Sequence, residues 1–359
     1  VFTANTGKQF GQYGPFQLGY RSDFSKFNKN GEYYLLADDG TKSPSFKINA
    51  DVYKGTADFT LRYMRQQRTL FNPFLQDSCH THDGFTMYAS SVGMPDSTRV
   101  EVAGGWHDAS DYLQYATTWA NATYHLLAAY RDFQSVFTAE KQANGLDGKN
   151  GIADVLDEAI WGLDWLVKMH PKPNIMFNQI ADDRDHTAMR LPGQDSVYGR
   201  GHERPVYFID GNPQQRGKFM NNTTGTSSTA AKFVSAFGLG HQLLKDQNAD
   251  YASILKEKAG TAYQYADMKP GVNQAVAVKS PYIYVEDNWV DDMELAEATM
   301  FNLNQNQEHI QKAMDFARQE KVTPWMVRDT ANHYQYYPFI NLGHFELAKS
   351  VNGKVKKEA

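Results

Sequence analysis

The sequence predicts a mainly α-helical protein preceded by a short β-rich segment, on the basis of three observations. From about residue 54 onward, apolar residues recur every three or four positions, which is the spacing of amphipathic helices. Residues 1–53 instead alternate polar and apolar side chains in short stretches between turns. The only long irregular stretch lies at 171–225, so most helices follow one another through short turns. This pattern predicts antiparallel helix pairs, as in a helix bundle or most of an α/α toroid.

The front segment reads as a few strands separated by turn signals. Strand-like stretches lie at 16–20, 31–37 and 45–48, and turn residues gather at 28–31 and 38–40. Three or so strands are too few for an independent sandwich. We therefore expect residues 1–53 to form part of a small β domain that is incomplete at its front.

Helices are expected in order along the rest of the chain. The clearest is the segment 152–169, in which apolar residues from Val155 to Val167 form one stripe and Asp154 and Asp157 place acid in the first turns. The complete set of expected helices is 55–68, 110–133, 152–169, 226–245, 249–267, 291–304, 306–320 and 338–350. The irregular stretch at 171–225 is expected to hold a functional loop or a short hairpin region.

Composition excludes several classes of protein. The 359 residues are 41% hydrophobic and 21% charged, which is incompatible with a disordered chain. The net charge is −5 and the basic residues are scattered, so we expect no nucleic-acid partner. No stretch approaches the roughly 20 apolar residues of a membrane-spanning helix. Aromatic residues reach 13%, which fits either a well-filled core or rings that line a ligand groove.

Cys79 is the single cysteine, which excludes an intrachain disulfide. The segment 79–84 contains two histidines, but its spacing is not that of a zinc site, and we expect a structured loop without metal. The chain starts at Val1 without a Met or an apolar leader. A removed signal peptide or a cut terminus would explain this start, and a secreted or periplasmic location is compatible with it.

The segment 104–111, Gly-Gly-Trp-His-Asp-Ala-Ser-Asp, carries the strongest functional signal. Asp108 and Asp111 stand three positions apart, directly before a predicted helix. One interpretation is helix capping, with Asp108 or Ser110 as the N-cap and Asp111 in the first turn. The other is a catalytic pair, in which one carboxylate orients a water and the other takes its proton. The residues alone leave both open.

This segment closely resembles the GGWYDAGD signature of glycoside hydrolase family 9, the β-glucanases and related enzymes with an (α/α)6 barrel. Similar stretches extend along nearly the whole chain, at 157–171, 182–186, 203–205 and 337–344. Residues 1–53 look like the second half of the N-terminal Ig-like domain of bacterial members. The resemblance thus implies a partial Ig-like β-sandwich at 1–53 and an (α/α)6-barrel catalytic domain at 54–359, lacking its C-terminal helices.

The resemblance implies an inverting hydrolase of β-1,4-linked glucans. It makes Asp111 the general base and Asp108 its partner in positioning the attacking water. His107 stands where the signature has Tyr, and Ser110 where it has Gly; both departures leave the carboxylates in place. An inverting enzyme needs its two carboxyl groups roughly 6.5–9.5 Å apart to admit that water.

Three further residues are candidates for substrate binding. The resemblance implies that His170 reaches sugar hydroxyls, although a histidine at a helix C-terminus can equally satisfy backbone carbonyls. His186 has the same two interpretations. Trp289 is suited to stacking on a sugar ring or to ordinary packing.

The general acid is the main departure from the family pattern. In the family it is a Glu towards the C-terminus, and no similar segment precedes Ala359. Glu346 reads as an ordinary helical residue. A complete (α/α)6 barrel also has more helices than are expected here. We therefore expect this chain to be part of a longer protein, with the rest of the same polypeptide as its partner.

Two alternatives to a complete hydrolase follow. The first is a catalytically incomplete fragment that binds glycan without cleaving it, and the second is a purely structural helical domain. In the second case, replacing the two Asp by Asn would cost only a helix cap, on the order of 1 kcal/mol.

No cofactor is expected to be required. Some family members bind calcium in the region that corresponds to Asp291, Asp292 and Glu294, which offer the oxygen ligands that calcium prefers. Met293 stands near the place of an expected ligating Asp, and the acidic first turn of a helix explains the run without any ion.

Overall fold

Contacts divide the chain into two units, Val1–Ala57 and Asp58–Ala359. The structure, a computed structural model, describes residues 2–5, 7–88, 92–109, 111–186, 189–197, 203–280, 286–320 and 342–351. None of the helices in these described residues combines the length and apolar character that a bilayer crossing requires.

The first unit contains short antiparallel strand pairs. β1 (Lys8–Gln9) pairs with β2 (Tyr20–Arg21), and β3 (Gly31–Tyr33) pairs with β4 (Phe46–Ile48). The β3–β4 pair falls within the stretches expected at 31–37 and 45–48. Aromatic rings fill the space beside it, with the Phe24 and Phe46 centroids 5.7 Å apart.

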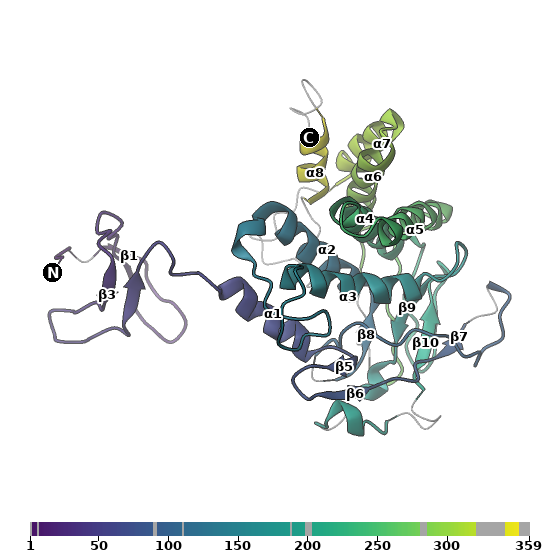
Figure 1. Cartoon of the computed structure of the whole chain (residues 1–359), viewed down its shortest axis with the longest axis horizontal. Helices are drawn as coiled ribbons and strands as arrows, with labels where there is room; N and C mark the ends of the chain where they lie inside the picture. The colour runs from purple at the N-terminus through teal and green to yellow at the C-terminus, as the bar shows by residue number, and fades with distance from the viewer. Residues whose placement is uncertain are drawn as a thin grey trace. The chain divides into compact units, whose positions relative to one another are not determined.

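The second unit is built mainly from helix pairs (Figure 1). Its helices in the described residues are α1 (Thr56–Gln66, which begins at the unit boundary), α2 (Ala116–Phe133), α3 (Asp154–Met169), α4 (Ser227–Leu244), α5 (Ala249–Met268), α6 (Val290–Asn304), α7 (Gln307–Ala317) and α8 (Leu342–Ser350). α2 packs on α3, α4 on α5 and α6 on α7, while α4 also contacts both α2 and α6. This succession of hairpins confirms the mainly α fold class.

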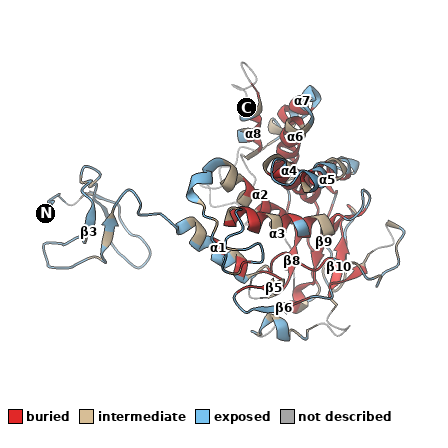
Figure 2. Ribbon diagram, in the orientation of Figure 1, coloured by how far each residue is buried: buried red, intermediate tan, exposed pale blue. Residues whose placement is uncertain are grey.

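Burial distinguishes an inner helix from an outer one (Figure 2). α4 is buried around its whole circumference along most of its length, including the consecutive residues Ser227–Gly240. Its partner α5 is buried only along one stripe, which includes Leu255, Ala259, Ala262 and Ala266. α4 therefore lies between other helices, and α5 covers it from outside, as in the layers of an α/α toroid.

A small mixed sheet lies beside the helices and holds the loops that matter for function. Its strand order is β7 (Phe85–Met87), β10 (Pro205–Phe208), β9 (Phe177–Ile180) and β8 (Gln114–Tyr115). β10 runs parallel to β7 and antiparallel to β9. The stretch at 171–225 thus contains a strand pair, in agreement with the expected hairpin region. A separate hairpin joins β5 (Leu70–Asn72) to β6 (Asp77–Cys79).

The expected helix at 110–133 begins later than predicted. α2 starts at Ala116, because Gln114 and Tyr115 pair with Ile180 and Gln179 of β9 as strand β8. The N-cap of α2 is Tyr115, which makes no side-chain capping hydrogen bond. Sheet pairing therefore outweighs the local capping pattern, and the capping interpretation of Asp111 was wrong.

A matched pair of helix glycines tests the packing between α2 and α3. A Cβ built on Gly162 of α3 would lie 2.2 Å from Thr123 Oγ1 and 2.4 Å from the Trp106 ring. We expect Gly162→Ala to destabilise the protein by about 1–3 kcal/mol, because the buried ring has no room to move. Gly260 of α5 has open space around the same position, so Gly260→Ala should stabilise by about 0.5–1 kcal/mol. Urea unfolding of both variants measures the difference, and equal effects would contradict it.

Candidate active site

The loop that carries Asp108 and Asp111 is anchored by the residues before it. Gly104 and Gly105 have positive φ values of 128° and 76°, and a Cβ on Gly105 would lie 2.9 Å from the Trp165 ring of α3. The next residue, Trp106, is fully buried and donates from Nε1 to Glu158 Oε1 at 2.7 Å. The two glycines thus let the chain pass closely over α3, and the buried indole fixes the start of the loop.

Asp111 forms an ion pair with His186, which lies far away in the sequence. Asp111 Oδ2 and His186 Nε2 are 2.9 Å apart, and the two side chains are 17% and 31% exposed. The other carboxylate oxygen, Oδ1, has no hydrogen-bond partner. The structure therefore brings together two residues that the sequence singled out, in a site that remains partly open to solvent.

Burial raises the pKa of Asp111 above its usual value, and this effect outweighs the opposing charges of His186 and Arg190. A carboxylate with a raised pKa is a stronger base than an ordinary aspartate. Asp111 is thus better suited than an ordinary aspartate to accept a proton from water.

Asp108 lies in the same loop and is half-buried. Its backbone N–H donates to the Leu113 carbonyl at 2.9 Å, which closes the loop between them. Asp108 and Asp111 therefore belong to one short, closed loop, and their action as a pair stays a prediction.

His170 does not join this site. Its side chain is fully buried, and its ring nitrogens lie 2.9 Å from the Ile175 carbonyl and 2.9 Å from Thr261 Oγ1. Burial lowers the pKa of His170 to about 4, so the ring is neutral at ordinary pH. With both nitrogens occupied inside the fold, His170 corresponds to the alternative of a helix C-terminal histidine that satisfies a backbone carbonyl.

Trp289 occupies the N-cap position of α6 and is partly exposed. Its ring packs edge-on against Phe316, with centroids 5.7 Å apart and an interplanar angle of 74°. The packing partner fixes the ring while part of its surface stays accessible, so stacking on a sugar stays a prediction.

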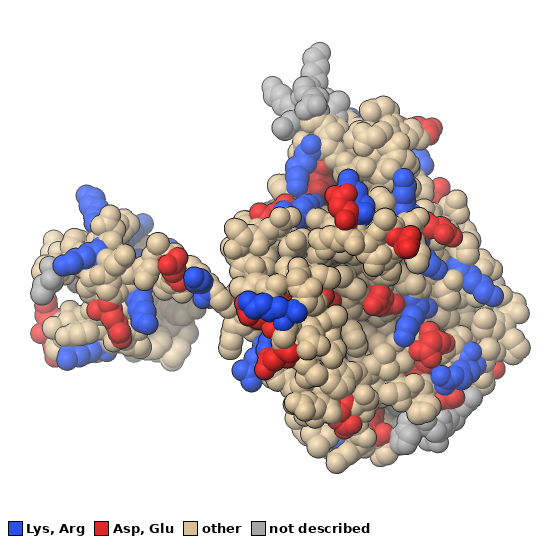
Figure 3. Space-filling view, viewed as in Figure 1, with Lys and Arg blue, Asp and Glu red and all other residues tan. Residues whose placement is uncertain are grey.

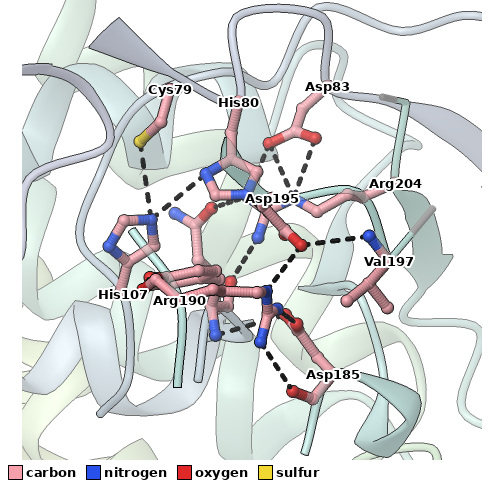
Figure 4. A network of polar contacts seen from close by, with 11 residues as sticks. Cys79, His80, Asp83, His107, Asp185, Arg190, Asp195, Val197 and Arg204 are labelled. Carbon is pink, nitrogen blue, oxygen red and sulfur yellow. Dashed lines mark hydrogen bonds and ion pairs between the residues drawn. The ribbon is translucent and has the colours of Figure 1, made fainter. Parts of the chain in front are cut away.

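A cluster of Cys79, His80 and His107 includes the residue directly before Asp108 (Figure 4). One ligand atom from each of these buried residues lies within 4.8 Å of the others. His80 Nδ1 is 3.2 Å from His107 Nε2, which is 3.7 Å from Cys79 Sγ. Thiolate and imidazole groups are the ligands that zinc prefers, so these three residues could hold a transition metal.

Sequence reasoning missed this cluster because it considered only the segment 79–84. His107 is distant in the sequence from Cys79 and His80 but lies next to them in the fold. Strand β6 ends at Cys79, and the neighbour of His107, Trp106, forms a β-bridge with Arg68. Burial raises the pKa of Cys79 to about 12 and lowers the pKa values of both histidines. All three groups are therefore neutral without a metal, and binding one would require the thiol to lose its proton.

Two residues of the acidic run considered for calcium form ion pairs. Asp292 Oδ2 lies 2.6 Å from Lys232 Nζ, and Glu294 Oε1 lies 2.7 Å from His344 Nδ1. Within the described residues, Asp291, Asp292 and Glu294 do not converge on one point as ligands of an ion would. Calcium binding at this run stays an untested expectation.

A second buried network supports the loop from the side of the sheet. Arg204 pairs with Asp83 at 2.6 Å and donates to Gln114 Oε1 at 2.5 Å, while Gln114 donates to the Gly104 carbonyl at 2.7 Å. Arg204 also donates to the Tyr112 carbonyl. The sequence analysis singled out the stretches 79–84 and 203–205 but gave Asp83, Gln114 and Arg204 no role, because a lone Asp, Gln or Arg carries no local signal of such a network.

Charged residues of both signs are mixed on one face of the molecule. On the face shown in Figure 3, Lys and Arg are interspersed with Asp and Glu, and no large area of one sign is seen. A uniformly basic stripe would mark a phosphate-binding surface.

Comparisons with known proteins agree with the geometry. The family model described as glycosyl hydrolase family 9 matches residues 53–357. A cellodextrinase from Butyrivibrio fibrisolvens is 28% identical over 250 residues, covering 68% of this chain and 41% of the relative. Endoglucanase D from Acetivibrio thermocellus is 24% identical over 303 residues, covering 81% of this chain and 44% of the relative. The chain thus spans less than half the length of these curated relatives.

A solved structure supports the fold. The crystal structure of a metagenome-derived glycoside hydrolase family 9 endoglucanase superimposes with a TM-score of 0.72 at 24% identity, covering 94% of this chain and 57% of that one. Structures of this family are (α/α)6 barrels, so the likeness confirms the fold class predicted from the sequence.

Proposed function

The chain belongs to glycosyl hydrolase family 9, and from this membership we propose that it acts on β-1,4-linked glucans such as cellulose, mixed-linkage glucan or xyloglucan. Relatives named cellodextrinase and endoglucanase support this substrate class. Because such polymers do not enter cells, the proposal includes a secreted, periplasmic or cell-surface location.

Asp111 is the proposed general base of a single-displacement reaction. It takes a proton from a water held with the help of Asp108, and the resulting nucleophile attacks the anomeric carbon from the face opposite the leaving oxygen. That oxygen receives a proton from a carboxylic acid, which we do not assign among the described residues. The product has the inverted anomeric configuration.

One observation carries this proposal: Asp111 caps no helix and instead lies in a closed loop, ion-paired to His186, with Oδ1 unpartnered. A partly buried carboxylate that caps no helix loses hydration on folding, which costs stability unless the group serves another purpose. Proton transfer is the purpose that fits its raised pKa.

Product release from soluble β-glucans tests the function. The chain is incubated with each polymer, new reducing ends are measured, and NMR follows the anomer formed in the first minutes. Release of the α-anomer from a β-linked substrate supports the proposal, whereas the β-anomer would overturn the single displacement. Binding without release would favour the alternative, a glycan-binding fragment without its acid. Neither binding nor release would overturn both.

A further inference from the structure

Two neighbouring contacts join the segment of Asp111 to the segment of His186. The partly exposed contact is the Asp111–His186 ion pair itself. The buried contact joins the residue after Asp111 to the residue before His186. In it, the Tyr112 backbone N–H donates to Asp185 Oδ2 at 3.2 Å. A fully buried carboxylate thus holds together the two stretches of chain that present the candidate base and its histidine.

The Asp185 carboxylate is itself held from its other side (Figure 4). Arg190 donates from Nη2 to Asp185 Oδ1 and from Nε to Asp195 Oδ1, the latter at 2.7 Å. The Arg190 guanidinium also stacks over the Tyr112 ring, 4.5 Å from its centroid, and the Tyr112 hydroxyl donates to the Arg190 carbonyl. Asp185, Arg190 and Tyr112 therefore form one unit in which each pair is in contact.

We propose that Asp185 is a positioning residue for the reaction: its carboxylate fixes the Asp111 loop against the His186 segment and so sets the Asp111–His186 contact. The inference rests on the proposed function in naming Asp111 as the base. Asp185 does not touch the reacting groups and acts through the backbone of Tyr112 and through Arg190, which holds Tyr112 as well.

The chemistry of the contact requires a carboxylate. One oxygen accepts from a backbone amide and the other from a guanidinium, and a charged acceptor makes both bonds stronger than a neutral amide would. Burial raises the pKa of Asp185 to about 6, although Arg204 and Arg190 oppose this effect. The fold therefore retains a costly buried charge at this position, as expected where a precise geometry has to be maintained.

The test measures the pKa of Asp111 by carboxyl NMR in protein labelled with ¹³C at the aspartate side chains. In Asp185→Asn, the Tyr112 backbone loses its anchor and Asp111 turns away from His186 but stays buried, so the contact that lowers the Asp111 pKa is lost while the burial that raises it is kept. The Asp111 pKa should therefore move upward by about one pH unit, and His186→Ala should move it in the same direction. Removing the Asp185 charge without moving the loop would instead lower the Asp111 pKa, so the direction separates positioning from simple electrostatics.

Asp183→Asn is the matched control. Asp183 is a buried aspartate of the same short helix, η3 (Asp183–Asp185), but its carboxylate accepts from the backbone amides of Val278, Lys279 and Ser280. This variant should lose stability and leave the Asp111 pKa unchanged. An unchanged or lowered Asp111 pKa in folded Asp185→Asn would overturn the proposal.

If Asp185→Asn does not fold, Arg190→Lys carries the same test. It keeps a positive charge near Asp111 but loses the planar fork that orients Asp185. A raised Asp111 pKa supports the proposal and an unchanged one overturns it. In an active protein, Asp185→Asn should also lower kcat about tenfold with little change in KM. Because the NMR measurement needs no turnover, a failure of the proposed function leaves this result readable.

Discussion

Replacing Asp111 by Asn in the full-length protein should lower kcat for soluble β-glucan by about 10²–10⁴-fold, with little change in glucan binding. The amide has nearly the shape of the carboxylate and can still contact His186, but it cannot take a proton from water. Initial rates of reducing-end release and calorimetric titration with a cello-oligosaccharide measure the two quantities separately.

Two variants serve as controls for this result. Asp147→Asn changes an aspartate whose side chain is 93% exposed, and it should leave kcat unchanged. Asp108→Asn should lower kcat less than Asp111→Asn, because its proposed task is to position the water. A larger loss in Asp108→Asn than in Asp111→Asn would exchange the roles of the two carboxylates.

The pH dependence of the reaction follows from the same assignment. The base must be deprotonated, so kcat/KM should fall as the pH drops through the pKa of Asp111. Since burial raises that pKa, the acidic limb of the profile should lie above the pH at which an ordinary aspartate titrates. His186→Ala should move this limb to still higher pH.

Helix positions were predictable from the sequence, because a helix with one buried face carries apolar residues every three or four positions. The stripe of α5 and the acidic first turn of α3 are local patterns, and both helices lie within about two residues of their expected bounds. The start of α2 was not predictable in this way. Gln114 and Tyr115, which were expected in the first turns of this helix, pair with β9 instead. No local pattern at these two residues reveals a strand partner more than 60 residues later in the chain.

The same distinction between local patterns and distant contacts applies to the candidate site. Asp108, Asp111 and His186 were found from sequence motifs, and the structure adds that Asp111 and His186 are in contact. His107 was noted only as a departure from the family signature, yet its ring lies with Cys79 and His80. Contacts of this kind depend on how loops cross, which a window of neighbouring residues does not contain.

Lys232 is a case in which a usable signal was overlooked. It stands between Ala231 and Phe233 in a helix rich in Ala, Gly and large apolar residues and otherwise free of Asp, Glu and Arg, where a charged residue is unusual. Its side chain is 3% exposed, and its ammonium lies 2.7 Å from Glu286 Oε1 and 2.6 Å from Asp292 Oδ2. A lone lysine in an all-round buried helix predicts buried carboxylates opposite it, and the acidic run at 291–294 supplies one of them.

Replacing Lys232 by Met should destabilise the protein by about 3–5 kcal/mol at pH 8. Methionine fills a similar volume, so the loss comes mainly from Glu286 and Asp292, which remain buried without their counter-ion. Urea unfolding followed by circular dichroism measures it. Lys312→Met is the matched control, because that side chain is 45% exposed and its Nζ lies 4.0 Å from Glu297; we expect a loss of about 0–1 kcal/mol there.

The loss in Lys232→Met should also depend on pH. Burial raises the pKa of Asp291 to about 7 and raises that of Asp292 as well, so the folded protein holds protons that the unfolded chain has released. The free energy of unfolding therefore falls as the pH rises from 3.8, the usual pKa of an aspartate, to the pKa that Asp291 and Asp292 have in the folded protein.

Without the Lys232 ammonium, the pKa values of Asp291 and Asp292 rise further. The pH range over which stability falls then extends to higher pH. The difference between Lys232→Met and the parent protein should therefore be larger at pH 8 than at pH 5.5. An equal loss at both pH values would mean that Lys232 contributes through the packing of its methylene chain, and the carboxylates would then have to be neutral in the parent protein as well.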